Sequence, residues 1–153
     1  MEETESTLET KKHIERVEYY LIKLSHEIAF RFINHDRSKL KSPEKEIFEI
    51  YTPKLKGSTY GSDEYKSFLK EMKVALDHHY KKNRHHPYHF KNGIKGMNLV
   101  DIIEMLCDWK AATERHLDGD IFKSIELNQS RFGYSDDLKQ IFINTAKMLS
   151  NKD

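Results

Sequence analysis

The sequence predicts an all-α single domain, a helical bundle of about six helices without a sheet. Apolar residues recur at three- and four-residue steps in every long segment, as they do on one face of an α-helix. No segment combines two-residue alternation with the turn signals that bound a half-buried strand. The length of 153 residues suits one domain with a hydrophobic core of its own.

The first predicted helix begins near Thr7, because Ser6 and Glu9 are spaced as in a capping box. It runs to about residue 34. Its amphipathic stripe consists of Val17, Leu21, Leu24, Ile28 and Phe32. Residues 1–6 are predicted to be a disordered acidic terminus, which leaves residues 7–150 as one helical domain.

The later helices are predicted from caps, breakers and the same apolar spacing. A short helix follows Ser42–Pro43, and residues 52–62 are predicted to be a loop because they contain one proline and two glycines. Ser62 caps a helix that reaches His79, and residues 83–97 form an irregular connection. The last three helices start at the Asn98 cap with Asp101, span Ile121–Phe132 before Gly133, and span Asp136–Leu149.

The composition excludes several classes of protein. Lys and Arg number 26 against 25 Asp and Glu, so no global charge attracts nucleic acid or an anionic membrane. No apolar run approaches the roughly 20 residues of a membrane span. The polar, acidic start predicts no signal peptide, and the single Cys107 cannot form an internal disulfide. We therefore expect a cytoplasmic protein, with any phosphate-bearing ligand held by a local site.

Histidine is unusually frequent and clustered. There are nine histidines, and five fall within twelve residues; these are His78, His79, His85, His86 and His89. Such clusters are typical of metal ligands.

Helical phase selects the side chains that point inward. His35 lies seven residues after Ile28 and continues the buried stripe of the first helix, and His79 does the same in its own helix. Glu104 and Asp108 are i, i+4 neighbours, so both carboxylates can reach one ion. Taken singly, each group has a plainer explanation as a core-edge histidine or a solvated helix face. Because three segments contribute together, we predict a metal site within residues 7–150.

The metal ligands predicted are His35, Asp36, His79, one or both of His85 and His86, and Glu104 or Asp108. Imidazole and carboxylate together suit one or two divalent ions of Zn, Fe, Mn, Ni or Co. Asp101 is left out because it is explained as a helix cap. His13 is left out because 22 helical residues place it roughly 33 Å from His35.

The segment His35-Asp36-Arg37-Ser38-Lys39 resembles the HDxGK element of the HD-domain metal phosphohydrolases. The resemblance implies an HD-domain-like bundle in which Asp36 can bridge two metal ions, with the later histidines and Asp108 as further ligands. Serine replaces the family's glycine here, and no earlier histidine is placed to supply the family's additional ligand. Glu104 is the candidate to replace that ligand.

A second resemblance covers most of the chain. The stretches HHYKKNRHHPYHF and GMNLVDIIEMLCDWKAA are similar to an uncharacterised family of small bacterial and phage proteins. That family has no settled activity to transfer.

The HD resemblance implies a hydrolase that cleaves a phosphoester of a nucleotide or of a cyclic or short oligonucleotide, using metal-activated water. Lys39 and Arg84 are the predicted cations for the transferred phosphate; for both, solvated surface charge is the alternative. Two other functions stay open: a di-iron HD-like oxygenase, and a non-enzymatic interaction protein with a structural metal. The sequence does not predict the oligomeric state.

Overall fold

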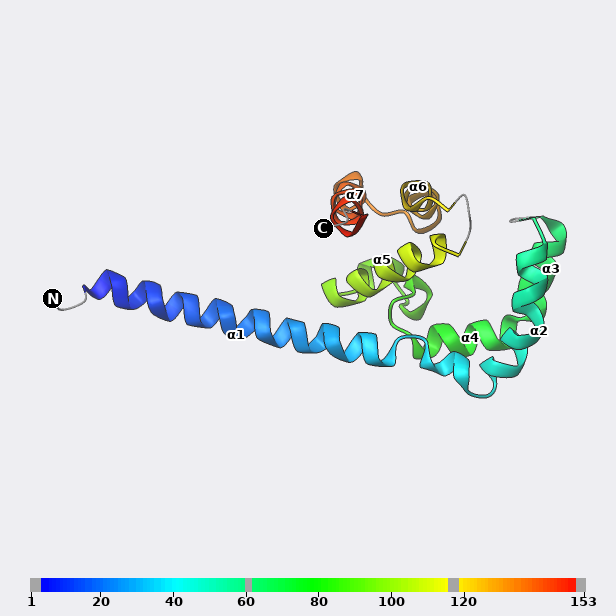
Figure 1. Cartoon of the computed structure of the whole chain (residues 1–153), viewed down its shortest axis with the longest axis horizontal. Helices are drawn as coiled ribbons and strands as arrows, with labels where there is room; N and C mark the ends of the chain where they lie inside the picture. Colours follow the sequence, from blue (N-terminus) through cyan, green and yellow to red (C-terminus); the bar gives the residue numbers. More distant parts are fainter. Residues whose placement is uncertain (1–3, 60–61, 116–118, 151–153) are drawn as a thin grey trace. The chain divides into compact units, whose positions relative to one another are not determined.

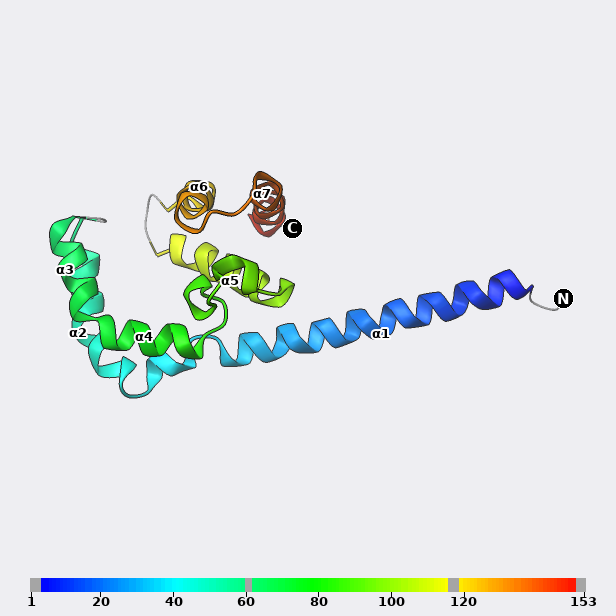
Figure 2. The same cartoon turned by 180° about the vertical axis from the view of Figure 1, so that it is seen from behind.

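The computed structural model describes residues 4–59, 62–115 and 119–150, and this part of the chain contains seven α-helices and no strand. The predicted all-α class is confirmed (Figures 1 and 2). The α-helices are α1 (Glu5–Asn34), α2 (Glu44–Gly57), α3 (Asp63–Glu71), α4 (Lys73–Lys82), α5 (Leu99–Thr113), α6 (Ile121–Phe132) and α7 (Asp136–Ser150). Three short 3-10 helices accompany them: η1 (Arg37–Leu40), η2 (Pro87–His89) and η3 (Gly93–Gly96). No helix of the described segments has the length and apolar character to cross a bilayer.

The chain divides into two compact units, residues 1–35 and 36–153. The described part of the first unit is essentially α1, a 30-residue helix in which no residue is buried. Thr4 caps it by accepting a hydrogen bond from the backbone N–H of Thr7 at 3.3 Å. The helix therefore begins two residues before the predicted start, because Thr4 and not Ser6 provides the cap. Residues 1–3 of the predicted disordered terminus lie outside the described residues.

The second unit begins with η1, α2, α3 and α4, which contact one another. The predicted loop over residues 52–62 is wrong in its first half, because α2 continues through Pro53 to Gly57. Contacts with α3 hold these last turns in place. The Tyr51 hydroxyl donates to Glu71 at 2.6 Å, and Lys54 lies over the rings of Tyr51 and Phe68. Residues 60 and 61 lie outside the described part.

The segment from Ser62 to His79 is two helices and not the single helix predicted. Ser62 caps α3 as predicted, accepting from the backbone N–H of Tyr65 at 3.1 Å. At Met72 the backbone ψ is 0°, which ends α3 and starts α4 on the next residue. Met72 and Ala75 are both fully buried at this junction.

The three C-terminal helices follow the prediction closely. Asn98 and Asp101 form the expected capping box of α5, and Gly133 ends α6 with a left-handed φ of 66°. Helix α7 ends at Ser150, one residue later than predicted. These helices enclose a hydrophobic core, which consists of Met105, Leu106, Ile121, Ile125, Tyr134, Phe142 and Ala146.

Asp101 fixes the connection between α4 and α5. Its carboxylate is fully buried and accepts from the backbone N–H of Asn98 at 3.0 Å. It also accepts two hydrogen bonds from the Arg84 guanidinium, at 3.1 and 2.9 Å. One side chain thus caps α5 and anchors the chain just before His85 and His86.

Asp101→Ala should destabilise the protein by about 2 kcal/mol, because it removes the α5 cap and leaves Arg84 without these bonds. Urea unfolding followed by circular dichroism measures the change. Asp137→Ala is the matched control, since Asp137 is exposed in the first turn of α7; its effect should stay within about 0.5 kcal/mol. Equal stability of both variants would contradict the role given to Asp101.

Candidate metal centre

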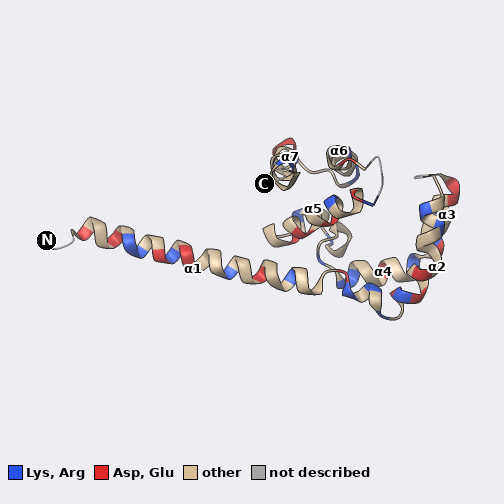
Figure 3. Cartoon of the chain, in the orientation of Figure 1, with Lys and Arg blue, Asp and Glu red and all other residues tan. Residues whose placement is uncertain are grey.

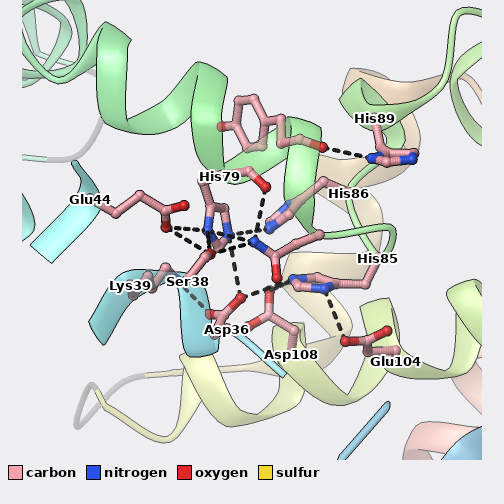
Figure 4. A network of polar contacts seen from close by, with 12 residues as sticks. Asp36, Ser38, Lys39, Glu44, His79, His85, His86, His89, Glu104 and Asp108 are labelled. Atoms are coloured by element: carbon pink, nitrogen blue, oxygen red, sulfur yellow. Dashed lines mark hydrogen bonds and ion pairs between the residues drawn. The ribbon is translucent and has the colours of Figure 1, made fainter. Parts of the chain in front are cut away.

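Four side chains of the second unit converge on one point. They come from the residue before η1, from α4 and from the connection that follows α4, and they are Asp36, His79, His85 and His86. Each offers one donor atom, and these four atoms all lie within 4.8 Å of one another. His79 and His85 are almost completely buried, at 2% and 1% exposure. Such a His/Asp cluster could hold a metal ion (Figure 4).

Asp36 lies at the centre of this set. Its backbone is left-handed, with φ 54° and ψ 13°, a conformation that Asp tolerates better than most residues. Its Oδ1 atom lies 3.3 Å from Nε2 of His79 and 3.5 Å from Nε2 of His85. Its Oδ2 atom accepts from Lys39 Nζ at 2.6 Å. One carboxylate oxygen therefore faces two imidazoles while the other is paired with a cation.

The outer nitrogen of His79 is held by Glu44. Nδ1 of His79 lies 2.8 Å from Glu44 Oε2, and because a carboxylate oxygen only accepts, Nδ1 carries the proton. The lone pair of His79 is then on Nε2, which faces Asp36 and the Nε2 atom of His86 at 2.9 Å. A carboxylate behind a histidine is the usual arrangement that orients a metal ligand.

Glu44 is itself fully buried and densely hydrogen-bonded. It accepts from His78 Nδ1 at 2.7 Å and from Ser38 Oγ at 3.0 Å. Asn83 extends the network, donating to Ser38 Oγ at 2.8 Å and to the backbone carbonyl of His79 at 2.9 Å. These hydrogen bonds hold the Glu44 carboxylate in place, and Glu44 in turn orients the ring of His79.

His85 also has a carboxylate beside its Nδ1 atom, on the side of α5. Its Nδ1 atom lies 3.1 Å from Oε1 of Glu104, and its Nε2 atom faces Asp36. Glu104 therefore lies behind His85 as Glu44 lies behind His79 (Figure 4). This position gives Glu104 an orienting role, outside the four converging donor atoms.

His79 and His86 are held in the neutral form that binds metals. Burial, followed by the nearby rings of His85 and His79, lowers the pKa of His86 to about 3. Burial and the Lys39 ammonium lower the pKa of His79, partly offset by Asp36 and Glu44. Neutral imidazole nitrogens are the ligating species.

The distances within the cluster fit a metal ion. Donors about 2.1 Å from an ion are roughly 3.0 Å apart in octahedral geometry and roughly 3.4 Å apart in tetrahedral geometry. The separations of 2.9, 3.3 and 3.5 Å lie close to this range, the shortest slightly below it and the longest slightly above it. The alternative is a hydrogen-bonded cluster in which His79 and His86 share one proton. Lys39 already pairs with the Asp36 carboxylate, so a divalent cation would offset the two carboxylates behind the rings, Glu44 and Glu104.

The other predicted site residues lie as follows. Asp108 Oδ2 is 4.0 Å from His85 Nε2, at the edge of the cluster. Lys39 is beside Asp36, whereas the Arg84 guanidinium is held by Asp101. His35 caps the C-terminal end of α1 and is the last residue of the first unit. The direct ligand role of His35 stays a prediction.

Glu44, Asn83 and the role of Ser38 were not predicted from the sequence. A glutamate in the first turn of a helix is ordinarily explained by the helix dipole, so Glu44 carried no signal of burial. His78 belongs to the histidine cluster in the sequence, but the structure uses it to bind Glu44.

Glu44→Gln should lower the affinity for a divalent transition metal by roughly 10- to 100-fold. The amide has one neutral acceptor oxygen for the three donors that Glu44 serves, so it holds the tautomer of His79 less firmly. Isothermal titration of metal-free protein with Zn²⁺ or Mn²⁺ measures the change. Glu46→Gln is the matched control: it removes the same charge from an exposed position of α2 and should bind as wild type. Unchanged affinity in Glu44→Gln would show that this carboxylate does not support a metal ligand.

The comparisons with known proteins identify a family without an assigned activity. The model of the family of unknown function DUF5662 matches residues 2–149. No curated protein and no solved structure matches the chain. The resemblance to an uncharacterised family is thus confirmed, while the likeness to HD-domain enzymes has no support from these comparisons. The chain belongs to DUF5662, a family of unknown function.

Proposed function

We propose that the protein is a metal-dependent phosphohydrolase that cleaves a phosphoester of a nucleotide or short oligonucleotide. The main support for this proposal is the cluster of donor side chains, Asp36, His79, His85 and His86. Two carboxylates, Glu44 and Glu104, lie behind the rings of His79 and His85. The order of these residues along the chain also resembles that of HD-domain phosphohydrolases.

Asp36, His79, His85 and His86 would hold a divalent ion, which would lower the pKa of a bound water and polarise a phosphoryl oxygen. In the hydrolysis the water oxygen bonds to phosphorus and the ester P–O bond breaks. The leaving alkoxide oxygen receives a proton from the water and departs as a neutral alcohol. Asp36, with oxygens facing both the histidines and Lys39, is placed to hold the ion and to keep Lys39 beside it. The histidines, oriented from behind, keep their lone pairs aimed at the same point.

Lys39 is the cation best placed for a phosphate. Its ammonium group is 2.6 Å from Asp36 Oδ2 and about a third of its side chain is exposed, so it can also contact a ligand. Arg84 is less suited, because its guanidinium donates two hydrogen bonds to buried Asp101. We therefore assign charge neutralisation to Lys39 first and keep Arg84 as a secondary candidate.

A pocket beside the cluster supports a nucleotide as the substrate class. It has a volume of about 500 Å³ and is lined by Asp77, Tyr80, Lys81, Tyr88 and His89. The Tyr80 ring lies 5.0 Å from both the Tyr88 ring and the His86 ring, between centroids. Tyr88 is 53% exposed, and the Arg131 guanidinium lies 5.2 Å from the centre of its ring. The exposed part of this ring is the surface on which we expect a base to stack. His86 would thus separate a base in the pocket from a phosphate at the metal.

A structural metal is the second candidate function. It is favoured by the position of the donors, which join η1 and α4 to the connection that leads into α5. An ion there would join the group formed by η1, α2, α3 and α4 to the chain that leads into α5, α6 and α7, as structural zinc does. The two functions differ in whether the bound ion keeps a position open for water.

Asp36→Asn should lower kcat for a phosphoester at least about 100-fold while leaving the circular dichroism spectrum unchanged. The change keeps the side-chain size but removes the charge that the ion needs. Turnover of a mononucleotide, a cyclic nucleotide and a generic phosphodiester by metal-loaded protein is the measurement. Asp137→Asn, on the surface of α7, should retain full activity. Metal-loaded wild type that cleaves none of the three substrates would leave the structural metal as the function.

Tyr88→Ala should raise KM for a nucleotide substrate roughly 10- to 100-fold with little change in kcat, because it removes a stacking surface remote from the reacting bond. Tyr88→Phe, which keeps the ring, should have a KM near that of wild type. A phosphodiester without a base should be cleaved equally by all three proteins. A KM that rises equally for the base-free substrate would show that the pocket does not hold the base.

A further inference from the structure

Helix α1 carries an apolar surface that the described part of its own unit does not cover. None of its residues is buried, and the exposed apolar side chains include Leu8, Ile14, Val17, Tyr19, Tyr20, Leu21, Ile22, Leu24, Ile28, Phe30, Phe32 and Ile33. Exposed apolar patches of this extent on soluble proteins mark interaction surfaces. The remaining question is which partner fits.

The apolar side chains form two stripes on opposite sides of the helix. The first follows alternating three- and four-residue steps, and we call it the seam; it consists of Ile14, Val17, Leu21, Leu24 and Ile28. The second contains the aromatic and aliphatic side chains of Tyr19, Ile22, Phe30 and Ile33, with His26 between them. At 100° per residue the centres of the two stripes are roughly 160° apart.

The spacing of the seam fits a partner helix. Steps of three and four residues place aliphatic side chains at the a and d positions of two successive heptads, where they insert between side chains of a facing helix. Tyr20 and Phe32 flank the seam and widen it. The opposite stripe departs from this spacing and is interrupted by His26, so the seam is the face better suited to a helix.

We propose that the seam of α1 pairs with the seam of α1 in a second copy of the chain, which makes the protein a homodimer. A seam of similar aliphatic side chains is complementary to itself, as a two-fold interface requires. Helix α1 carries five acidic and five basic residues, with both signs interspersed along it (Figure 3). Two copies of the helix therefore have no net charge that opposes pairing.

The available area is sufficient for a stable dimer. The five seam residues are between 38% and 61% exposed, and flanking Tyr20 and Phe32 are 53% and 73% exposed. Covering seven such side chains removes on the order of 600 Å² from water on each helix, and the stems of neighbouring Lys and Arg add to it. Stable interfaces bury roughly 800 Å² per partner. Pairing is independent of the metal centre and of the proposed hydrolase activity.

The test is the mass of the full chain in solution, measured by light scattering and sedimentation equilibrium at micromolar concentration. The wild type should have twice the 18.2 kDa mass of one chain. Leu21→Glu with Leu24→Glu should raise the dimer dissociation constant roughly 100-fold or more and give a monomer, because four carboxylates would enter the paired seams. Lys12→Gln with Lys23→Gln changes the net charge equally at positions outside the seam and should leave the dimer intact.

A second variant separates loss of pairing from loss of the helix. Leu21→Ala with Leu24→Ala keeps helix propensity, since alanine is the stronger helix former, but removes seam volume. Its dissociation constant should rise roughly tenfold or more with an unchanged circular dichroism spectrum. A wild-type monomer at micromolar concentration, or a dimer that survives both seam variants, would overturn the proposal.

Discussion

Burying several histidine rings next to one another is costly unless the nitrogens that face each other are satisfied. Here the rings of His79 and His86 approach to 2.9 Å between their Nε2 atoms, beside one oxygen of Asp36. Glu44 accepts a hydrogen bond from Nδ1 of His79, so the Nε2 atom that faces the cluster presents a lone pair. A divalent cation is the partner that satisfies neutral imidazoles and a carboxylate at these separations.

The rest of the second unit depends on how this cluster is held. Helix α4 and η1 supply His79 and its network, while α5 supplies Glu104 and Asp108 from a helix packed on α6 and α7. Arg84 and buried Asp101 clamp the connection that carries His85 and His86. The donors therefore lie where the group formed by η1, α2, α3 and α4 meets α5. His79 is held by Glu44 of that group, whereas His85 lies beside Glu104 of α5. This arrangement explains why an ion there would contribute to stability as well as to chemistry.

Apolar periodicity and capping residues were enough to predict the helices whose ends are determined by the nearby sequence. The Asn98 cap, the Gly133 terminus and the Ser62 cap are set within a few residues of the chain, and all three are present. The errors arose where tertiary contacts prevail over local preference. Pro53 is inside α2 because Tyr51 and Lys54 pack on α3, and no local pattern indicates that contact.

The same division applies to the candidate site. Helical phase predicted His79, because inward direction on a helix follows from spacing alone, and clustering predicted His85 and His86. Asp36 came from the resemblance to the HDxGK element. Glu44 was missed because its partners, His78 and His79, are more than thirty residues away in the sequence. The different roles of Glu104 and Asp108 could not be predicted either, since two carboxylates on one helix face are equivalent until the position of His85 is known.

X-ray absorption at the zinc edge of tag-free, zinc-loaded protein tests the central claim most directly. We predict stoichiometric uptake and a first shell of nitrogen and oxygen at about 2.0–2.1 Å, with the outer-shell scattering of at least two imidazoles. The imidazole signal should fall in His79→Ala. Uptake well below one ion per chain, or a shell of water oxygens without imidazole scattering, would contradict a metal centre built on Asp36 and these histidines.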